Sequence, residues 1–262
     1  MKFAIDHDMH IHSQLSLCSG HAEQTAENIL KYAHENGFKH ICVTDHFWDE
    51  KVPGASNWYS KQGYENVSKI LPLPTDEAVR FDFGCETDMD KFFTLGIARE
   101  TVDKFDFVIV PTNHLHMTGV TVDKDNISVA SRAKFFMERN HALLDMDLPF
   151  AKMGIAHFTC NLLTYYGEGT SDELLDLITD SQYHELFERI AKCGMGVELN
   201  VSPEEIASQS ALRPYRIARE CGCKFYLGSD AHTPGELARA RGRMEGIVDA
   251  LGLTEDDKFP FI

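Results

Sequence analysis

The stretch KFYLGSDAHTPGE, residues 224–236, contains one complete structural unit of this 262-residue chain. Its first part is a short β-rich run of the kind that forms a buried strand. Asp230 and His232 follow that run, and both side chains can bind a metal ion. The segment from Thr233 to Glu236 then matches a capping box, with proline at the first helical position. The stretch therefore predicts a strand, a polar turn and a helix, in that order.

The same order recurs along the whole chain. Helical periodicity follows Thr25 and stops at Gly37, and further capping boxes begin at Thr170 and Ser202. Strand followed by helix predicts parallel strands with crossover helices, in an α/β barrel or a doubly wound sheet. We expect one domain over residues 1–262, with a long insertion at 48–74 near the carboxyl ends of the strands. The predicted strands are residues 3–6, 40–45, 80–86, 105–112, 152–158, 194–200 and 224–230.

Composition limits the partners. A formal charge of −16 disfavours a protein that binds duplex DNA or anionic lipid, although metal ions can still attract a small phosphorylated substrate. We find no apolar run near 18 residues and no basic region followed by an apolar one, so we expect a cytoplasmic protein with no membrane span. The seven cysteines are scattered and favour reduced thiols. The sequence leaves the oligomeric state open.

Every predicted strand ends in side chains that can ligate a metal or orient a ligand. Because the carboxyl ends of parallel strands meet at one edge, we expect these side chains to converge. They are His10, His12, Asp45, His46, Glu86, His114, His157, Glu198, Asn200, Asp230 and His232.

The spacing of these residues indicates the chemistry. On a strand, residues i and i+2 share a face, so His10 and His12 can present two imidazoles to one site. Imidazole with carboxylate suits zinc, manganese or iron better than magnesium or calcium, and Glu86 can bridge two ions. Two or three divalent transition-metal ions holding a bridging hydroxide as nucleophile could hydrolyse a phosphoester.

The motifs together resemble a known family. D-x-H-x-H at 8–12, T-D-H at 44–46 and S-D-A-H at 229–232 occur in the order typical of the polymerase and histidinol phosphatase (PHP) superfamily. GVELN at 196–200 and YLGSDAHTP at 226–234 are similar to histidinol-phosphate phosphatases of that superfamily. The resemblance covers almost the full chain and implies a distorted (β/α)7 TIM-like barrel with a two- or three-metal phosphoesterase site. The metal ligands it implies are His10, His12, His46, Glu86, His114, His157, Asp230 and His232.

Some assignments stay open at this point. The family's third early ligand could be Cys18 or His21, and we favour His21. His116 competes with His114 as a ligand, since the two have the same parity.

Asp45, Glu86 and Asp230 are candidates for roles in catalysis, with Asp8 and Asp45 more suited to orienting histidines from behind. Glu198 and Asn200 are expected to complete a buried hydrogen-bond network. The phosphate-binding arginine could be Arg132, Arg139, Arg213 or Arg216.

We predict a metal-dependent phosphomonoesterase with histidinol phosphate as its leading substrate, whose amine an acidic pocket rim would attract. A rival is an amidohydrolase-type barrel, which usually needs a modified lysine on a middle strand, where this chain has Glu86. A second rival is a non-catalytic PHP-like metal-binding module. The complete ligand set, with no polymerase attached, argues against it.

Overall fold

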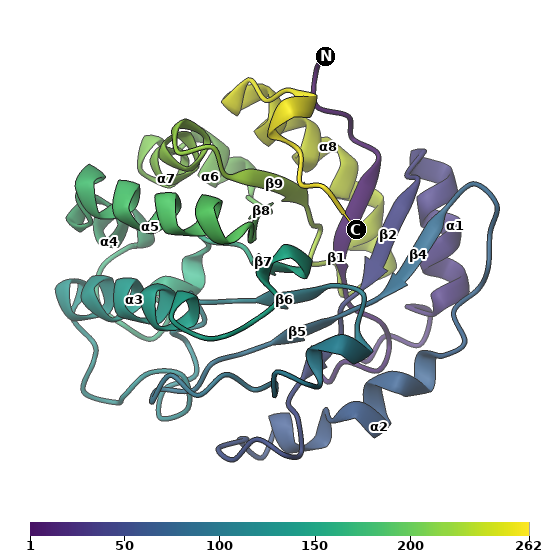
Figure 1. Cartoon of the computed structure of the whole chain (residues 1–262), viewed down its shortest axis with the longest axis horizontal. Helices are drawn as coiled ribbons and strands as arrows, with labels where there is room; N and C mark the ends of the chain where they lie inside the picture. The colour runs from purple at the N-terminus through teal and green to yellow at the C-terminus, as the bar shows by residue number, and fades with distance from the viewer. Residues whose placement is uncertain (262) are drawn as a thin grey trace.

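The computed structural model describes residues 1–261 and contains two parallel sheets (Figure 1). Every strand pair within them is parallel, as predicted for an α/β fold. The smaller sheet has the order β1 (His7–Ile11), β2 (His40–Val43), β4 (Arg80–Phe83). The larger has the order β3 (His46–Phe47), β5 (Cys85–Thr87), β6 (Val108–Val110), β7 (Met153–Ile155), β8 (Gly196–Leu199), β9 (Lys224–Leu227).

The two sheets continue into each other. β3 begins three residues after β2 ends, and β5 begins two residues after β4 ends. On the other side of β1, the amide of Asp230 donates to the carbonyl of His10 (2.8 Å) and the amide of His12 donates to the carbonyl of Ala231 (3.0 Å). The segment that follows β9 therefore lies beside β1, so strands that are far apart in the sequence are neighbours in space.

Apolar side chains from both sheets meet in one interior cluster. The rings of Phe107 and Tyr226 pack edge to face with centroids 5.1 Å apart, and Phe259 joins them from the C-terminal segment. Because this cluster draws on strands of both sheets, the sheets face each other across it. Its members are Met9, Cys42, Phe107, Ile109, Ala156, Tyr226 and Phe259.

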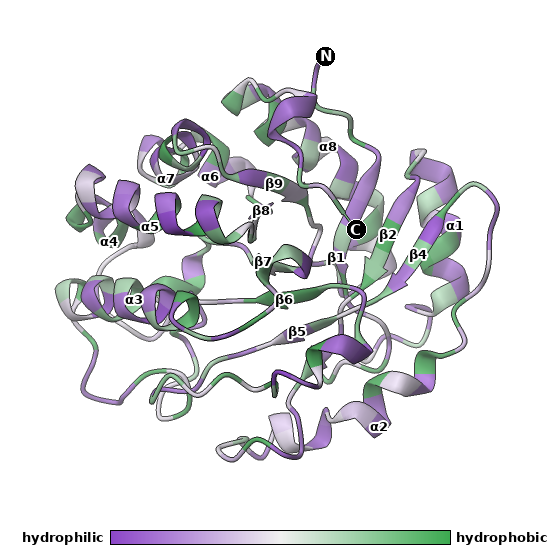
Figure 2. Ribbon diagram, in the orientation of Figure 1, coloured by the Kyte–Doolittle hydropathy of each residue, from purple (hydrophilic) through white to green (hydrophobic). Residues whose placement is uncertain are grey.

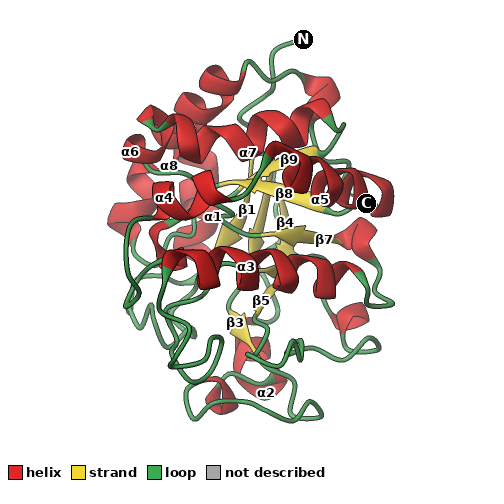
Figure 3. Cartoon of the chain, turned by 90° about the vertical axis from the view of Figure 1, so that its left-hand side faces the viewer, coloured by secondary structure: helices red, strands yellow, loops and turns green. Residues whose placement is uncertain are grey.

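Helices pack around the strands (Figure 3) and combine apolar with polar residues (Figure 2), and their buried apolar residues join the hydrophobic core. The longer helices are α1 (Ala26–Asn36), α3 (Val129–Leu144), α4 (Ser171–Leu177), α5 (Asp180–Cys193), α7 (Gln209–Glu220) and α8 (Pro234–Leu251), and α2 (Tyr64–Val67) and α6 (Pro203–Ala207) are short. Six 3-10 turns are η1 (Tyr59–Lys61), η2 (Ser68–Ile70), η3 (Val102–Lys104), η4 (Phe150–Lys152), η5 (Asn161–Leu163) and η6 (Glu255–Asp257). Over residues 1–261, none of the helices is both long and apolar enough to span a bilayer.

The helix boundaries follow the predicted caps in most places. Thr25 caps α1, Gly37 ends it in the left-handed region (φ 68°), and the boxes at Thr170 and Ser202 form. Thr233 caps α8, but the carboxylate of Glu236 accepts a hydrogen bond from the amide of His232 (2.7 Å). The capping box predicted at Thr233 is therefore only half formed, because the carboxylate of Glu236 binds the backbone amide of His232 and not that of Thr233.

Two strand predictions are wrong in detail. Residues 3–6 are not a strand, since the amide of Phe3 donates to the carbonyl of Leu253 and sheet pairing begins only at His7. The predicted strand at 80–86 is broken at Gly84, where a β-carbon would lie 2.5 Å from the carbonyl oxygen of Phe107. Such a close backbone approach requires glycine and interrupts the strand.

Candidate metal centre

Glu86, on β5, lies at the centre of the polar residues that follow the strands. Its Oε2 is 2.9 Å from His46 Nδ1 and 3.3 Å from His12 Nε2. Its Oε1 is 3.3 Å from His157 Nε2 and 4.0 Å from His114 Nε2. One buried carboxylate thus faces imidazoles delivered by four different strand ends.

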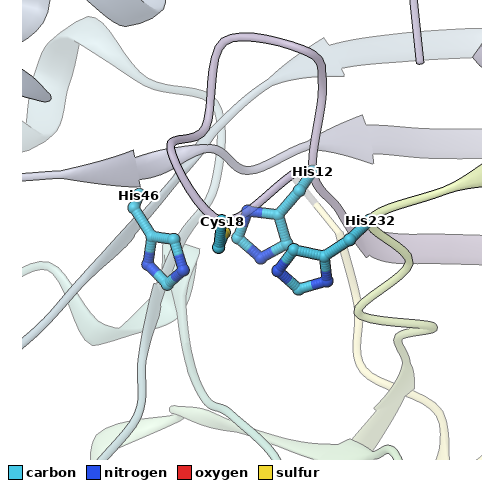
Figure 4. Close-up of side chains that lie close together, drawn as sticks. All are labelled: His12, Cys18, His46 and His232. Atoms are coloured by element: carbon cyan, nitrogen blue, oxygen red, sulfur yellow. The ribbon is translucent and has the colours of Figure 1, made fainter. Parts of the chain in front are cut away.

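Around Glu86, the ligand-type side chains form four overlapping groups, and within each group the possible ligand atoms lie within 4.8 Å of one another. Figure 4 shows one group, in which side chains from separate parts of the chain point toward one another. Four residues each belong to two groups, so neighbouring sites could share ligands. The groups are His12, Cys18, His46 and His232; His10, His12 and Glu86; His10, His157 and Asp230; and Glu86, His114 and His157.

The buried polar atoms of this centre fit bound cations. His46 Nδ1 and Glu86 Oε2 are buried and make no hydrogen bond, although they lie close together. His10 Nε2 and His12 Nε2 are 3.1 Å apart. Buried polar atoms normally have a partner, and a divalent ion ligated by imidazole, thiolate and carboxylate would give these atoms one. That donor set suits zinc, manganese or iron.

In four of the ligand-type imidazoles, the other ring nitrogen is held from behind. A partner on Nδ1 fixes the ring and leaves Nε2 for the centre, an arrangement common among metal-binding histidines. The Nδ1 partners are Glu198 Oε1 for His10 (2.7 Å), Ser16 Oγ for His12 (3.0 Å), Asp88 Oδ2 for His114 (2.8 Å) and Asn113 Oδ1 for His157 (3.0 Å).

Electrostatics inside the centre are strongly coupled. Burial disfavours the charged form of Glu86, but the facing His46 and His10 outweigh it and hold its pKa well below the usual range. Burial likewise opposes a charged His12, yet Asp230 and Glu86 raise its pKa to about 9. Burial lowers the pKa of His46, and it lowers that of His232 to about 4. A cation that binds here has to displace a proton from His12, as metal binding commonly does.

Asp45 acts through its neighbours. It is buried, and its carboxylate accepts hydrogen bonds from the amide of Ser13 (2.7 Å), the hydroxyl of Ser13 (2.6 Å) and the hydroxyl of Ser16 (2.8 Å). Ser16 contacts His12 in turn. Asp45 does not line the cavity, so this geometry fits a positioning role rather than contact with a substrate.

The structure brings Cys18, and not His21, into the centre. Residues 16–20 form a tight turn in which the amides of Ser19 and Gly20 donate to the carbonyl of Ser16. This turn directs Cys18 toward His12 and carries His21 outward, where it is exposed and its Nδ1 lies 3.3 Å from the amide of Glu23. The preference for His21 is therefore not supported by the geometry.

A cavity of about 700 Å³ opens beside the ligand groups. Its lining includes His46, Glu86, His114, His157 and Asp230, and residues of the 48–74 insertion also reach it. His116 lines it as well, with its ring edge-on to His114, but belongs to none of the ligand groups.

None of the four arginines considered from the sequence lines this cavity. Arg132 and Arg139 are buried and donate to backbone carbonyls, and Arg139 also donates to Asp88. Arg213 pairs with Asp180 on the surface, and Arg216 donates to Gln209.

Sequence reasoning missed two supporting residues. Asp88 follows Glu86 by two positions, directly after the end of β5, and this strand-like spacing is the signal that could have found it. Asn113 directly precedes His114 and contacts His157, a contact between two strand ends that the sequence pattern does not reveal.

Parallel strands that bring histidines and carboxylates to one edge define an α/β protein with side-chain clusters able to hold metal ions. The model of the PHP domain family matches residues 8–202, and the chain belongs to that family. Over 255 residues it is 26% identical to a probable phosphatase of Thermoanaerobacter sp. (strain X514), with 95% of this chain and 87% of that protein covered.

Solved structures of similar fold exist. The structure of histidinol phosphate phosphatase from Lactococcus lactis, in complex with zinc, L-histidinol and phosphate, is similar at a TM-score of 0.62 and 14% identity, over 97% of this chain and 98% of that one. A candidate histidinol phosphatase from Listeria monocytogenes is similar at 0.62 and 13% identity, over 90% of this chain and 99% of that one. At these identities the likeness concerns the fold.

Proposed function

We propose that this protein is a metal-dependent phosphomonoesterase. The observation that carries the proposal is the position of Glu86, whose two carboxylate oxygens face different sets of histidines. A carboxylate placed in this way can bridge two ions. The probable phosphatase that matches most of the chain, and the neighbour bound to zinc and phosphate, support the same reaction class.

The fold proposal that accompanies it is a distorted (β/α)7 barrel in one domain over residues 1–262. Counting β2 with β3 and β4 with β5 as bent strands leaves seven strand positions. The hydrogen bonds between β1 and the segment after β9 support closure. A closed barrel would gather all the strand ends around one rim.

The chain's own residues would hold and orient the centre. We propose His10, His12, Cys18, His46, Glu86, His114, His157, Asp230 and His232 as ligands of two or three divalent ions. Bound ions of this kind would activate water and neutralise charge on the phosphoryl group.

The residues behind the ligands would keep each imidazole in place. Glu198 and Asp88 would fix the tautomers of His10 and His114 through Nδ1. Asp45 would hold His12 through Ser16.

Histidinol phosphate is the specific substrate to test first. The motifs similar to histidinol-phosphate phosphatases favour it, as does the neighbour bound to histidinol and phosphate. The acidic rim that we expected for its amine is not found within residues 1–261, where Glu86 and Asp230 are the only carboxylates that line the cavity and both face imidazoles. The reaction class is thus better supported than this substrate.

The rival functions have less support. An amidohydrolase-type site needs a bridging lysine, whereas no lysine lines the cavity and Glu86 takes the central position. A purely structural metal module would not require the cavity of about 700 Å³ beside the ligand groups.

The test combines elemental analysis with a substrate series. Purified protein should retain two or three transition-metal ions per chain, and chelation should abolish phosphatase activity. We expect kcat/KM to be higher for small phosphomonoesters, histidinol phosphate among them, than for bis-nitrophenyl phosphate or a short oligonucleotide. Full activity without metal, or a preference for the diester, would refute the proposal, and metal retention with no turnover would favour the non-catalytic module.

A further inference from the structure

The cavity has a second part, beyond the ligand groups, that the proposed chemistry does not use. Its apolar lining consists of Trp58, Met117, Val120 and Leu162. The other lining residues here are uncharged polar side chains such as Asn57 and Thr118, together with His116. Apart from Glu86 and Asp230, the described part of the chain contributes no aspartate, glutamate, lysine or arginine to the lining.

The four apolar residues, which we call the apolar wall, come from three separate loops. Trp58 precedes η1, Met117 and Val120 lie between β6 and α3, and Leu162 lies in η5. All four are half-buried, so each keeps apolar surface toward the cavity. The wall also adjoins the metal centre, because the ring of Trp58 packs edge-on against that of His46 with centroids 4.9 Å apart.

Buried arginines hold two of these three loops in place. Arg132 donates to the carbonyls of Leu115 (2.8 Å) and Leu163 (3.1 Å), which joins the two loops that carry Met117 and Leu162. Arg139 donates to the carbonyl of Thr121 (3.1 Å), next to Val120. A wall held in this way is formed before a ligand arrives, and this preorganisation lowers the entropic cost of binding.

We propose that the apolar wall binds the leaving group of the phosphoester, and that it selects a flat, uncharged, aromatic group. Aromatic rings gain most from an apolar pocket with a neighbouring ring. A charged amine would lose hydration there with no free carboxylate to pair with. Trp58 is the main specificity residue, since it is the largest member of the wall and adjoins His46. This inference rests on the proposed phosphomonoesterase function and names its substrate class.

Benzyl phosphate and ethyl phosphate test the wall directly. Their leaving alcohols have similar reactivity, so a difference in kcat/KM reports binding of the ring. We expect benzyl phosphate to be the better substrate, and Trp58→Ala to lower its kcat/KM about tenfold, mainly through KM, which corresponds to partial loss of a buried aromatic contact. The ratio of kcat/KM for benzyl phosphate to that for ethyl phosphate should therefore be lower in Trp58→Ala than in the wild-type protein. Phe92→Ala is the matched control, because Phe92 is 74% exposed and does not line the cavity.

A second pair of substrates tests the effect of the charged amine. Histidinol phosphate and its analogue without the amine differ only in that group, and we expect the analogue to have an equal or higher kcat/KM. A clear preference for the amine, or equal turnover of benzyl and ethyl phosphate, would overturn the wall inference while leaving the phosphomonoesterase function intact. No turnover of any phosphomonoester by the metal-loaded protein would instead refute the function itself. Metal content of Trp58→Ala, measured alongside, identifies a variant that has merely lost its fold.

Discussion

The two ends of the same set of strands have opposite chemistry. At the carboxyl ends, imidazoles and carboxylates surround a cavity of about 700 Å³. At the amino ends, a space of only about 10 Å³ is left among the apolar side chains of Met9, Phe107, Phe259 and Phe261 and the charged side chains of Arg80, Asp82, Asp106 and Lys152. β1 contributes to both, because Met9 packs in the apolar cluster while His10, the next residue, faces the metal centre.

The amino ends of the strands therefore contribute mainly to stability, and the carboxyl ends contribute mainly to function. At the amino ends of the strands, which we call the closed end, apolar burial stabilises the fold by roughly 25 cal/mol for each Å² removed from water. At the carboxyl ends of the strands, which we call the open end, buried polar atoms such as His46 Nδ1 have no hydrogen-bond partner. Such atoms lower the stability of the fold until a ligand binds them. Substitutions at the two ends should therefore affect different measurements.

The largest effect is expected from Glu86→Gln at the open end. The amide keeps the shape of the side chain but removes the charge that faces the histidines of four strand ends. We expect kcat/KM for the preferred phosphomonoester to fall about 1,000-fold, at the upper end of losses when one electrostatic group is removed from a site. Elemental analysis should show fewer bound ions.

Glu188→Gln provides the matched control, since Glu188 is exposed on α5. It should leave both activity and metal content unchanged. If Glu86→Gln kept wild-type activity, Glu86 would have no central role. The inference that the open end carries the activity would then fail.

The next largest effect belongs to the closed end. Phe107 is buried and packs edge-on against Tyr226, Phe259 and Phe261. Phe107→Ala should lower the free energy of unfolding by about 3 kcal/mol, as is usual when a buried phenylalanine is truncated. Denaturant unfolding measures this change. Activity per folded molecule should stay close to wild type, and a large loss of metal would show that the two ends are coupled.

A smaller effect should distinguish the two candidates for the third early ligand. Cys18→Ser should weaken metal binding by about 10- to 100-fold, a loss comparable to that from removing groups that support a metal site. His21→Ala should have no effect, because His21 is exposed and outside the ligand groups. Competition with a chelator of known affinity gives the measurement. Normal affinity in Cys18→Ser together with weak binding in His21→Ala would restore the assignment favoured from the sequence.

Sequence patterns were most informative where backbone geometry is regular. The parity of His10 and His12 on a strand, and the strand-helix order, predicted the parallel α/β fold and the convergence of polar side chains. The cap at Thr25 and the stop at Gly37 were also confirmed. Regular elements have fixed periods, so residue spacing alone is enough to predict which side chains share a face.

Irregular segments were less predictable. Cys18 reaches the centre through a turn after β1, where no fixed period relates residue spacing to direction. The apolar wall combines three loops, and the arrangement of two of them depends on contacts with Arg132 and Arg139, which are distant in sequence. The arginines were considered from the sequence as phosphate ligands, because residue type alone does not reveal whether a guanidinium is buried against carbonyls.

The smallest expected effect concerns pH and the closed end. His7 is buried, its Nε2 accepts a hydrogen bond from the amide of Leu227 (3.0 Å), and Asp6, Lys258 and His40 are the titratable groups that face it.

Burial is the largest influence and lowers the pKa of His7 to about 4, despite the opposing effect of Asp6. An unfolded histidine has a pKa near 6.5, so the unfolded chain binds this proton at a higher pH than the folded protein does. Stability should therefore fall as pH drops through the interval from about 6.5 to about 4.

His7→Gln keeps an acceptor for the amide of Leu227 but cannot titrate. Between about pH 7.5 and about pH 5.5, the wild-type protein should lose about 1 kcal/mol more unfolding free energy than the variant, the size expected for one histidine with this shift. Urea unfolding at both pH values measures the difference, and because the metal centre is the same in both proteins its own pH dependence cancels. Parallel pH profiles would mean that His7 is not held neutral, and the closed end would then be less isolated from water than its packing indicates.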